Sequence, residues 1–284
     1  MSSESVAVDA ALRDWIVAQV QAGATPEAVV APLIERGWPE QVAIDAVERV
    51  VRDFLAEHAR ANALPVPVPV PVPLGDGAST VEVEGRRIEV IASMRHPRVV
   101  VFGNVLDDEE CEALIELARP RLRRSAVVNA ETGEDEIHEA RTSQSVGLVR
   151  GQTPLCERIE RRIATLLQWP YGHGEGLMLL RYGPGAEYRP HYDYFDPERP
   201  GNAGILARGG QRVASLVMYL NTPARGGATT FPDVGVEVAA IKGNAVFFSY
   251  DRPHPMTRSL HGGAPVLEGE KWVATKWLRE RHHE

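Results

Sequence analysis

A tract of alternating proline and valine at residues 65–73 is the feature that most limits how this chain of 284 residues can fold. Alternating proline removes most of the N–H donors that a helix or a central strand requires, and it favours the polyproline II conformation. At about 3.1 Å per residue, the tract would span roughly 28 Å as a semi-rigid spacer. We therefore predict two folding units joined by a Pro-Val-rich linker at residues 63–78, in which Gly75 and Gly77 end the repeat.

Residues 1–62 are predicted to form a small helical bundle. Thr25 followed by Pro26 is typical of a helix N-terminus, with an N-cap residue and proline at the first helical position. Gly23 and Gly37 separate three helical stretches, whose apolar residues recur at helical spacing. Those apolar positions are Leu12, Trp15, Ile16 and Val20, and then Ala43, Ala46, Val47, Val50, Phe54 and Leu55.

The turn at Gly37 and Trp38 can be interpreted in two ways. Its surroundings are similar to ubiquitin-associated helical modules, which implies a docking unit that binds a partner protein through residues 1–62. Ubiquitin itself is not predicted as that partner. The alternative is structural, because a three-helix bundle of this size needs a glycine turn and an aromatic plug.

Residues 79–284 have the pattern of a β-rich domain. Short apolar runs are separated by Gly, Pro and Asp clusters, which is typical of an antiparallel sandwich or barrel. One helix is predicted to begin at Asp107, where Glu110 completes a capping-box pattern, and another covers about residues 154–167. This predicts an α+β fold, a double-stranded β-helix (jelly roll) buttressed by helices. The predicted strands are residues 99–102, 177–182, 213–220, 245–250 and 272–278.

Charge and composition exclude several classes of partner. The net charge of −8, from 31 basic and 39 acidic residues, disfavours non-specific binding to nucleic acid, which requires a basic surface. The first residues lack the basic and apolar regions of a signal peptide, and no apolar run is long enough to span a membrane.

Cys111 and Cys156 each lie in an amphipathic stretch and are expected to be buried thiols in a reducing compartment. We expect a cytoplasmic protein without nucleic-acid or membrane partners.

The pair His191 and Asp193 is the strongest indication of chemistry. In an extended strand these two residues point to the same face, so an imidazole and a carboxylate would converge on one point. Two histidines and one carboxylate leave three metal positions open, as non-haem Fe(II) oxygenases require. The third ligand is expected to be His254 or His261. His261 is favoured, since it lies just before a predicted strand start at residues 265–266, whereas His254 sits between two prolines. Alone, such a pair also fits an ordinary His and Asp near a strand end.

The residues around this pair resemble the prolyl 4-hydroxylase-like Fe(II)/2-oxoglutarate-dependent dioxygenases, over about residues 97–280. Six segments in the same order carry the resemblance, which makes it far more specific than any one of them. They are LRYGPGAEYRPHYD (180–193), QRV with MYL (211–213 and 218–220), GGATTFP (226–232), GNAVFF (243–248), SLHGGAPV (259–266) and GEKWVATKW (269–277).

The resemblance implies a set of ligands for iron and for the cosubstrate. His191, Asp193 and His261 would bind Fe(II), and Lys271 would bind the distal carboxylate of 2-oxoglutarate. A dianion in a buried slot needs a cation at its far end, and a buried ammonium needs an anion. Outside this context, Lys271 would be interpreted as a surface lysine with a partly buried stem.

The resemblance also implies contacts to the cosubstrate and the substrate. Tyr182 and Tyr219 would lie beside 2-oxoglutarate, where their hydroxyls could donate hydrogen bonds, although either could be a core tyrosine. The acidic segment 131–139 would form a lid over the substrate. Residues similar to those of a peptide groove, each with a structural role as the alternative, are Arg141, Ser143, Glu175, Tyr188, Arg212 and Trp272.

The implied function is hydroxylation of prolyl residues at the 4-position in a polypeptide. Fe(II) and O2 would be required, 2-oxoglutarate would be converted to succinate and CO2, and ascorbate is a candidate further cofactor. One alternative is an oxygenase that acts on a free amino acid or another small molecule. The other is a non-catalytic scaffold recruited by the helical unit.

Overall fold

The computed structural model describes residues 8–73, 77–128, 131–136 and 138–283. The chain divides into two compact units, Met1–Pro67 and Val68–Glu284. Gly75 of the predicted linker and Ile137 of the predicted lid lie outside the described residues. No helix in the described ranges is both long enough and apolar enough to cross a membrane.

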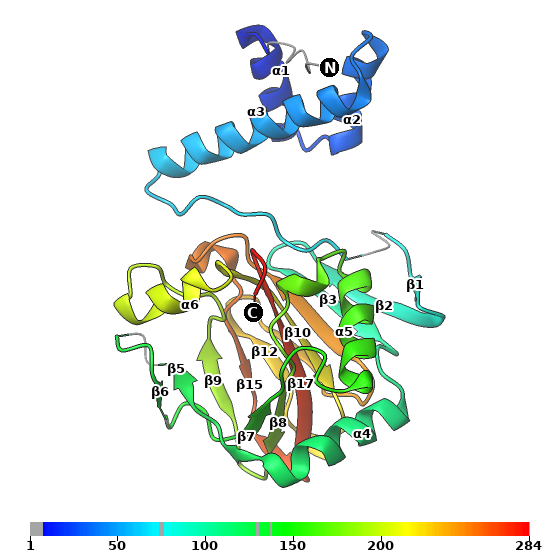
Figure 1. The fold of residues 1–284 in the computed structure, drawn as a ribbon, viewed down its shortest axis with the longest axis vertical. Coiled ribbons are helices and arrows are strands. Elements are labelled where there is room, and N and C mark those ends of the chain that lie inside the picture. Colours follow the sequence, from blue (N-terminus) through cyan, green and yellow to red (C-terminus); the bar gives the residue numbers. More distant parts are fainter. Residues whose placement is uncertain (1–7, 74–76, 129–130, 137, 284) are drawn as a thin grey trace. The chain divides into compact units, whose positions relative to one another are not determined.

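The first unit consists of the three helices that the sequence predicts, α1 (Ala10–Gln21), α2 (Pro26–Glu35) and α3 (Glu40–Ala61) (Figure 1). The Thr25 hydroxyl accepts a hydrogen bond from the Ala28 N–H, and Pro26 begins the helix. Apolar faces of the three helices form a core of Ile16, Val29, Leu33, Ala43, Val47 and Val50. The half-buried Trp38 packs against this core and Gly37 has a positive φ of 90°, as an aromatic plug and a glycine turn require.

The second half of the Pro-Val tract packs on the second unit. Val68 and Val70 pack against the larger apolar core of that unit, and Pro71 and Pro73 are buried. The Val68 N–H donates a hydrogen bond of 2.7 Å to the Asp251 carbonyl. Val68 and Val70, within the predicted linker at residues 63–78, therefore belong to the apolar core of the second unit, whereas Val72 is exposed.

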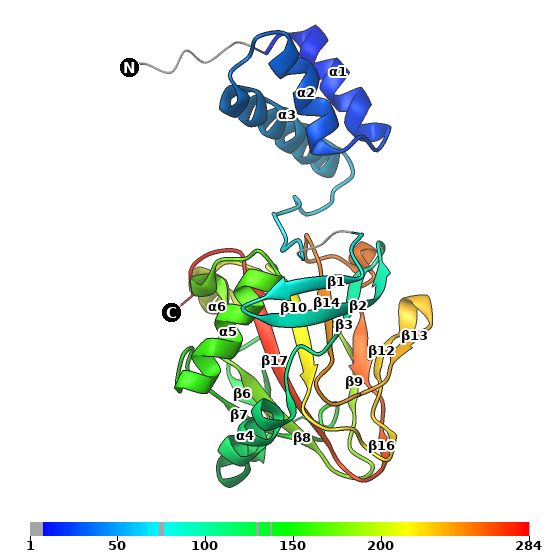
Figure 2. The same ribbon diagram turned by 90° about the vertical axis from the view of Figure 1, so that its right-hand side faces the viewer.

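The second unit is built on two antiparallel sheets that face each other as a jelly roll (Figure 2). The nine-stranded sheet has the order β1-β2-β3-β14-β10-β17-β8-β7-β4, and the four-stranded sheet has the order β13-β12-β15-β9. In the order given, the first sheet comprises Thr80–Val83, Arg86–Met94, Arg98–Gly103, Ala245–Ser249, Arg212–Tyr219, Lys271–Arg279, Met178–Tyr182, Gln144–Gly147 and Arg123–Arg124, and the second comprises Val236–Val238, Thr229–Phe231, His261–Gly263 and Tyr188–His191. Each of the five predicted strands is present.

Two helices cover the outer face of the large sheet. They are α4 (Asp108–Ala118), which begins with the predicted capping box of Asp107 and Glu110, and α5 (Pro154–Leu166). Their apolar residues share one core with the outward-facing side chains of the sheet, whereas a second core fills the space between the two sheets. The alternation is clear along β17, where Trp272 and Ala274 belong to the helix-side core and Val273 to the inner one.

A buried ion pair ties α5 to the sheet. The Lys276 ammonium lies 2.6 Å from a carboxylate oxygen of Glu160, and the two side chains are 2% and 0% exposed. We predict that Lys276→Met lowers the free energy of unfolding by about 3–5 kcal/mol, because it leaves a buried carboxylate without its cation.

Urea unfolding measures this loss, and Lys242→Met is the matched control. The Lys242 ammonium pairs with Asp108 and Glu112 at 3.0 and 3.1 Å, but these carboxylates are 84% and 70% exposed. Its removal is expected to cost no more than about 1 kcal/mol. Equal losses in the two variants would contradict the prediction.

Candidate metal centre

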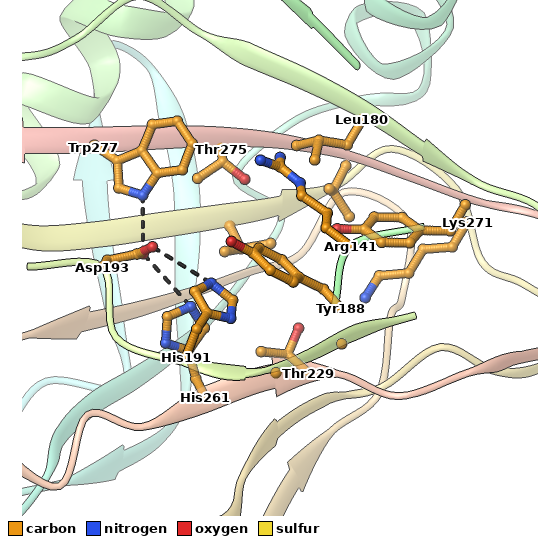
Figure 3. Close-up of a pocket in the computed structure, with 15 residues that line it drawn as sticks. Arg141, Leu180, Tyr188, His191, Asp193, Thr229, His261, Lys271, Thr275 and Trp277 are labelled. Atoms are coloured by element: carbon orange, nitrogen blue, oxygen red, sulfur yellow. Dashed lines mark hydrogen bonds and ion pairs between the residues drawn. The ribbon is translucent and has the colours of Figure 1, made fainter. Parts of the chain in front are cut away.

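Two strand ends and one bend bring the predicted metal ligands together. His191 is the last residue of β9 and pairs directly with His261, the first residue of β15. Asp193 does not share the strand with His191 as predicted, because β9 ends at His191 and Asp193 follows in a bend. The three ligand atoms nevertheless lie within 4.8 Å of one another. Figure 3 shows the three side chains pointing toward one another. In the part of the chain that the structure describes, this is the one such group of three.

Backbone hydrogen bonds determine which nitrogen of each histidine faces the centre. The Nδ1 of His191 lies 2.9 Å from the Arg189 carbonyl, and the Nδ1 of His261 lies 3.1 Å from the Ser259 carbonyl. A carbonyl can only accept a hydrogen bond, so each Nδ1 is the donor, and in the neutral tautomer the lone pair is on Nε2. Both Nε2 atoms point at Asp193, at distances of 3.6 and 3.5 Å from its oxygens.

The charges of the site suit a divalent metal. Burial lowers the pKa of His261 to about 4, so its imidazole is neutral near pH 7. Burial opposes ionisation of Asp193, but the contacts with His261 and His191 keep the pKa of that carboxyl well below its usual range. Two imidazoles and one carboxylate form the donor set of non-haem Fe(II) sites. His254 lies elsewhere, and its Nδ1 accepts a hydrogen bond from the Met256 N–H.

Lys271 lies in a pocket next to these three residues (Figure 3). It is 4% exposed, and its ammonium lies 5.6 Å from the ring centroids of both Tyr182 and Tyr219. Burial lowers the pKa of Lys271 to about 8, and no acidic side chain in the described ranges pairs with it. The Tyr219 hydroxyl donates a 2.8 Å hydrogen bond to Thr229. A buried cation without an anion is unfavourable, so the pocket suits an anionic ligand.

A second cavity of about 400 Å³, which we call the groove cavity, opens beside the metal ligands. Arg141 lines both cavities, and the Tyr188 ring stacks on His191 with 3.6 Å between ring centroids. Arg212 forms a bidentate pair with Glu175 at 2.7 and 2.8 Å, which holds one wall in place. The other lining residues include Tyr192, Tyr194, Phe195, Arg199 and Trp277.

Two of the predicted substrate residues lie outside this cavity. Trp272 is 1% exposed and belongs to the helix-side core, where the guanidinium groups of Arg119 and Arg181 flank its ring. Trp272 follows Lys271 on one strand, so the two side chains must point to opposite faces. Ser143 is buried, lines neither cavity, and lies 2.9 Å from the Ser125 hydroxyl.

The predicted acidic lid adjoins the groove cavity. It begins in the connection between β5 (Val127–Val128) and β6 (Asp135–Glu136), which pair as a short hairpin. The Glu131 carboxylate lies 2.6 Å from the guanidinium of Arg199, a residue of the cavity wall. This ion pair connects the hairpin to the segment that follows the metal ligands.

The sequence prediction missed two residues that contact Asp193. The Ser215 hydroxyl and the Trp277 indole N–H both donate to its Oδ2, at 2.6 and 2.9 Å. The position of Trp277 could have been predicted from the sequence. It lies an even number of residues from Lys271 on one strand, so the two side chains must point to the same face. No sequence pattern around Ser215 indicates that it contacts Asp193.

Comparisons with known proteins agree with this geometry. The sequence profile of the 2OG-Fe(II) oxygenase superfamily matches residues 177–279. Probable prolyl 4-hydroxylase 3 of Arabidopsis thaliana is 40% identical over 203 residues, which cover 64% of this chain and 69% of that protein. Prolyl 4-hydroxylase 1 of the same plant is 41% identical over 203 residues, or 65% of this chain and 70% of that protein.

Among solved structures, the viral collagen prolyl hydroxylase of Paramecium bursaria Chlorella virus-1 in complex with 2OG is similar, with a TM-score of 0.49 and 27% identity. The match covers 64% of this chain and 95% of that one. The plant relatives carry the assignment, since they combine high identity with coverage of more than two thirds of their length. This chain belongs to the prolyl 4-hydroxylase family of the 2OG-Fe(II) oxygenase superfamily, whose members require Fe(II), 2-oxoglutarate and O2.

Proposed function

We propose that this oxygenase hydroxylates prolyl residues of a polypeptide at the 4-position and releases succinate and CO2. The observation that carries the proposal is Lys271, a buried cation that no acidic side chain of the described ranges pairs with, beside two histidines and a carboxylate. Such a pocket requires an anionic ligand that reaches the metal. The relatives named prolyl 4-hydroxylase support the choice of prolyl residues.

We assign Fe(II) to the Nε2 atoms of His191 and His261 and to the carboxylate of Asp193. These residues fit the metal because each Nδ1 donates to a backbone carbonyl and both Nε2 atoms face the carboxylate. The bound iron supplies the activation of O2 that is coupled to decarboxylation of 2-oxoglutarate. We assign the distal carboxylate of 2-oxoglutarate to Lys271, with Tyr182 and Tyr219 on either side of the ammonium.

The groove cavity is the proposed binding site for the peptide. The ring of Tyr188 packs on the metal ligand His191, so an aromatic surface borders the reacting position and suits a pyrrolidine ring. Arg141 is 7% exposed, and its Nε has no hydrogen-bond partner among the described residues. Arg141 also lines the cavity, where its guanidinium can bind a peptide carbonyl. Glu175 and Arg212 neutralise each other in the cavity wall.

Turnover of proline-rich peptides tests the proposal. Wild-type protein with Fe(II), 2-oxoglutarate, air and ascorbate is expected to add one oxygen atom to proline, with a matching amount of succinate. His191→Ala should lose both products because it removes a metal ligand. His254→Ala is the matched control and should keep both, since His254 lies outside the metal cluster. Mass spectrometry of peptide and succinate measures the outcome.

The possible results separate the alternatives. Succinate without oxidised peptide would move the substrate to a free amino acid or another small molecule. Absence of succinate from iron-loaded wild-type protein would contradict the oxygenase mechanism itself. Time courses of product formation with and without ascorbate show whether ascorbate is required.

The affinity for 2-oxoglutarate should depend on the protonation of Lys271. Its pKa of about 8 means that the ammonium form predominates below that pH and is lost above it. Because the dianion binds the ammonium form, affinity should fall by up to about tenfold per pH unit above the pKa. Equilibrium dialysis of the metal-loaded protein without oxygen measures this. Lys271→Arg stays charged over this range, so its affinity should vary much less with pH. Equal pH dependence in both proteins would contradict the assignment.

Two substitutions test the groove cavity by steady-state kinetics. Arg141→Gln is expected to raise KM for the peptide by about tenfold, because a charge-assisted hydrogen bond contributes about 1.5–3 kcal/mol. Trp272→Phe should leave KM unchanged and only lower stability, since Trp272 lies in the helix-side core. A larger KM effect for Trp272→Phe than for Arg141→Gln would contradict this placement of the peptide.

A further inference from the structure

Four arginines lie close together where α4 leads into the edge strand β4. Arg119 pairs with Glu116 at 3.2 Å. The other three are exposed and form no ion pair with any residue that the structure describes: Arg121, Arg123 and Arg124. We call these three residues the basic edge.

The sign of the charge on the basic edge needs an explanation. Charged side chains on an edge strand prevent pairing with other chains, and this role is the structural alternative. It requires charge but no particular sign, and strand β1 at the opposite edge of the same sheet carries Glu82 as its charged residue. Three guanidinium groups without acidic partners, in a chain of net charge −8, favour a negatively charged ligand.

The register of the sheet places the basic edge beside the groove cavity. Arg123 pairs with Ser145 of β7, which in turn pairs with Leu180 of β8. Directly opposite residues in a ladder have their side chains on one face, so Arg123 shares the face of Leu180, which lines the pocket beside the metal ligands. Met178, two residues away on β8, and Ala126, two residues after β4, both line the groove cavity. The basic edge therefore lies two strand spacings, or about 10 Å, from β8.

We propose that the basic edge binds acidic residues of the polypeptide substrate, a few residues away from the prolyl residue that is hydroxylated. The inference rests on the proposed function and adds a substrate class to it, prolyl segments with a flank of glutamate or aspartate. A guanidinium can bind a carboxylate through two parallel N–H bonds. A flank of three or four residues, at about 3.3 Å each, covers the distance between the cavity wall and Arg123.

The backbone of β4 offers a second contact to an extended substrate. The Ser125 N–H donates to the Ser143 carbonyl at 3.0 Å. Bonding groups alternate along an antiparallel ladder, so the N–H and C=O of Arg124 point away from β7. Since β4 is the last strand of its sheet, an extended flank can pair with this edge while its carboxylates contact the guanidinium groups.

The acidic lid limits where such a flank can lie. The lid carries Glu131, Glu134, Asp135 and Glu136, and Glu131 pairs with Arg199 in the cavity wall. Like charges repel, so an acidic flank is unfavourable beneath this hairpin. The acidic residues are therefore expected on one side of the target proline only, the side that leaves the cavity over β4.

Kinetics with matched peptides test the proposal. Proline-rich peptides carry three glutamate residues either before or after the target proline, and the reference peptides carry glutamine at the same positions. In wild-type protein, one of the two glutamate placements should lower KM by about three- to tenfold relative to glutamine, the effect of one or two exposed ion pairs. The difference should shrink at high salt, because exposed charges are screened.

Substitutions in the basic edge assign the effect to its residues. The double variant Arg121→Gln, Arg123→Gln should lose the difference in KM between glutamate and glutamine peptides, whereas Arg121→Lys, Arg123→Lys should keep most of it. Arg121→Glu, Arg123→Glu should instead favour peptides with lysine at these positions. The matched control is Arg87→Gln, Arg95→Gln, which removes two exposed arginines at the other end of the same sheet and should behave like the wild type.

Several outcomes would overturn the proposal. They are equal KM values for glutamate and glutamine peptides in the wild type, an equal benefit from both placements, or a difference that survives Arg121→Gln, Arg123→Gln. If the arginines only protect the edge, this variant should aggregate more readily in light scattering while its peptide preference is unchanged.

A binding measurement separates this proposal from the proposed function. Fluorescence anisotropy of labelled peptides with iron-loaded protein and 2-oxoglutarate, without oxygen, gives the same comparison of glutamate and glutamine in the absence of turnover. Tighter binding of a glutamate peptide without hydroxylation of any peptide in air would count against the proposed function and not against the basic edge. Equal binding of the two peptides would overturn the role of the basic edge.

Discussion

The antiparallel register between β10 and β17 is the constraint on which the site depends. It pairs Ser215 with Trp277 near the metal ligands and Tyr219 with Val273 near the lysine pocket. The next pairing, of β17 with β8, sets Lys271 opposite Tyr182. A shift of β17 by one residue would turn its side chains Lys271, Val273 and Trp277 toward the helices. The outer core prevents such a shift, because Trp272, Ala274 and Leu278 would then leave their apolar surroundings.

The buried charges of the domain fall into two kinds, and the contrast indicates which of them serve chemistry. Lys276 is buried with Glu160, and the buried Arg279 and the half-buried Arg212 both pair with Glu175. These cations are neutralised within the fold and hold its elements together. Lys271 is equally buried, but burial lowers its pKa and no carboxylate of the described residues pairs with it. Only an added anion can offset that cost, so the lysine marks a ligand site.

Much of the fold could be predicted from local patterns. The capping residues Asp107 and Thr25 and the apolar runs of the strands act within a few residues of sequence, and their elements are present as predicted. The course of the Pro-Val tract from Val68 onward was not predictable, because it depends on an apolar surface formed by distant segments. The same holds for Ser215, whose role arises from its partner across the ladder.

The errors in the predicted site have different physical origins. The assignment of Trp272 followed similarity to a family pattern and overlooked the alternation of faces that places Trp277, rather than Trp272, on the side of Lys271. Asp193 does lie beside His191 and His261, as predicted. It does not lie on the same strand as His191, because that strand ends at His191.

Convergence of His191 and Asp193 coincides with the end of strand β9. Residues two apart in an ideal strand are separated by about 6.6 Å and their side chains leave the sheet in parallel. Ligands of one metal must instead approach one another, and here the three ligand atoms lie within 4.8 Å. The bend after His191 provides this approach, while the ladder between His191 and His261 fixes the other two ligands. In this chain, His191 and Asp193 therefore come together at the point where the regular pairing of β9 stops.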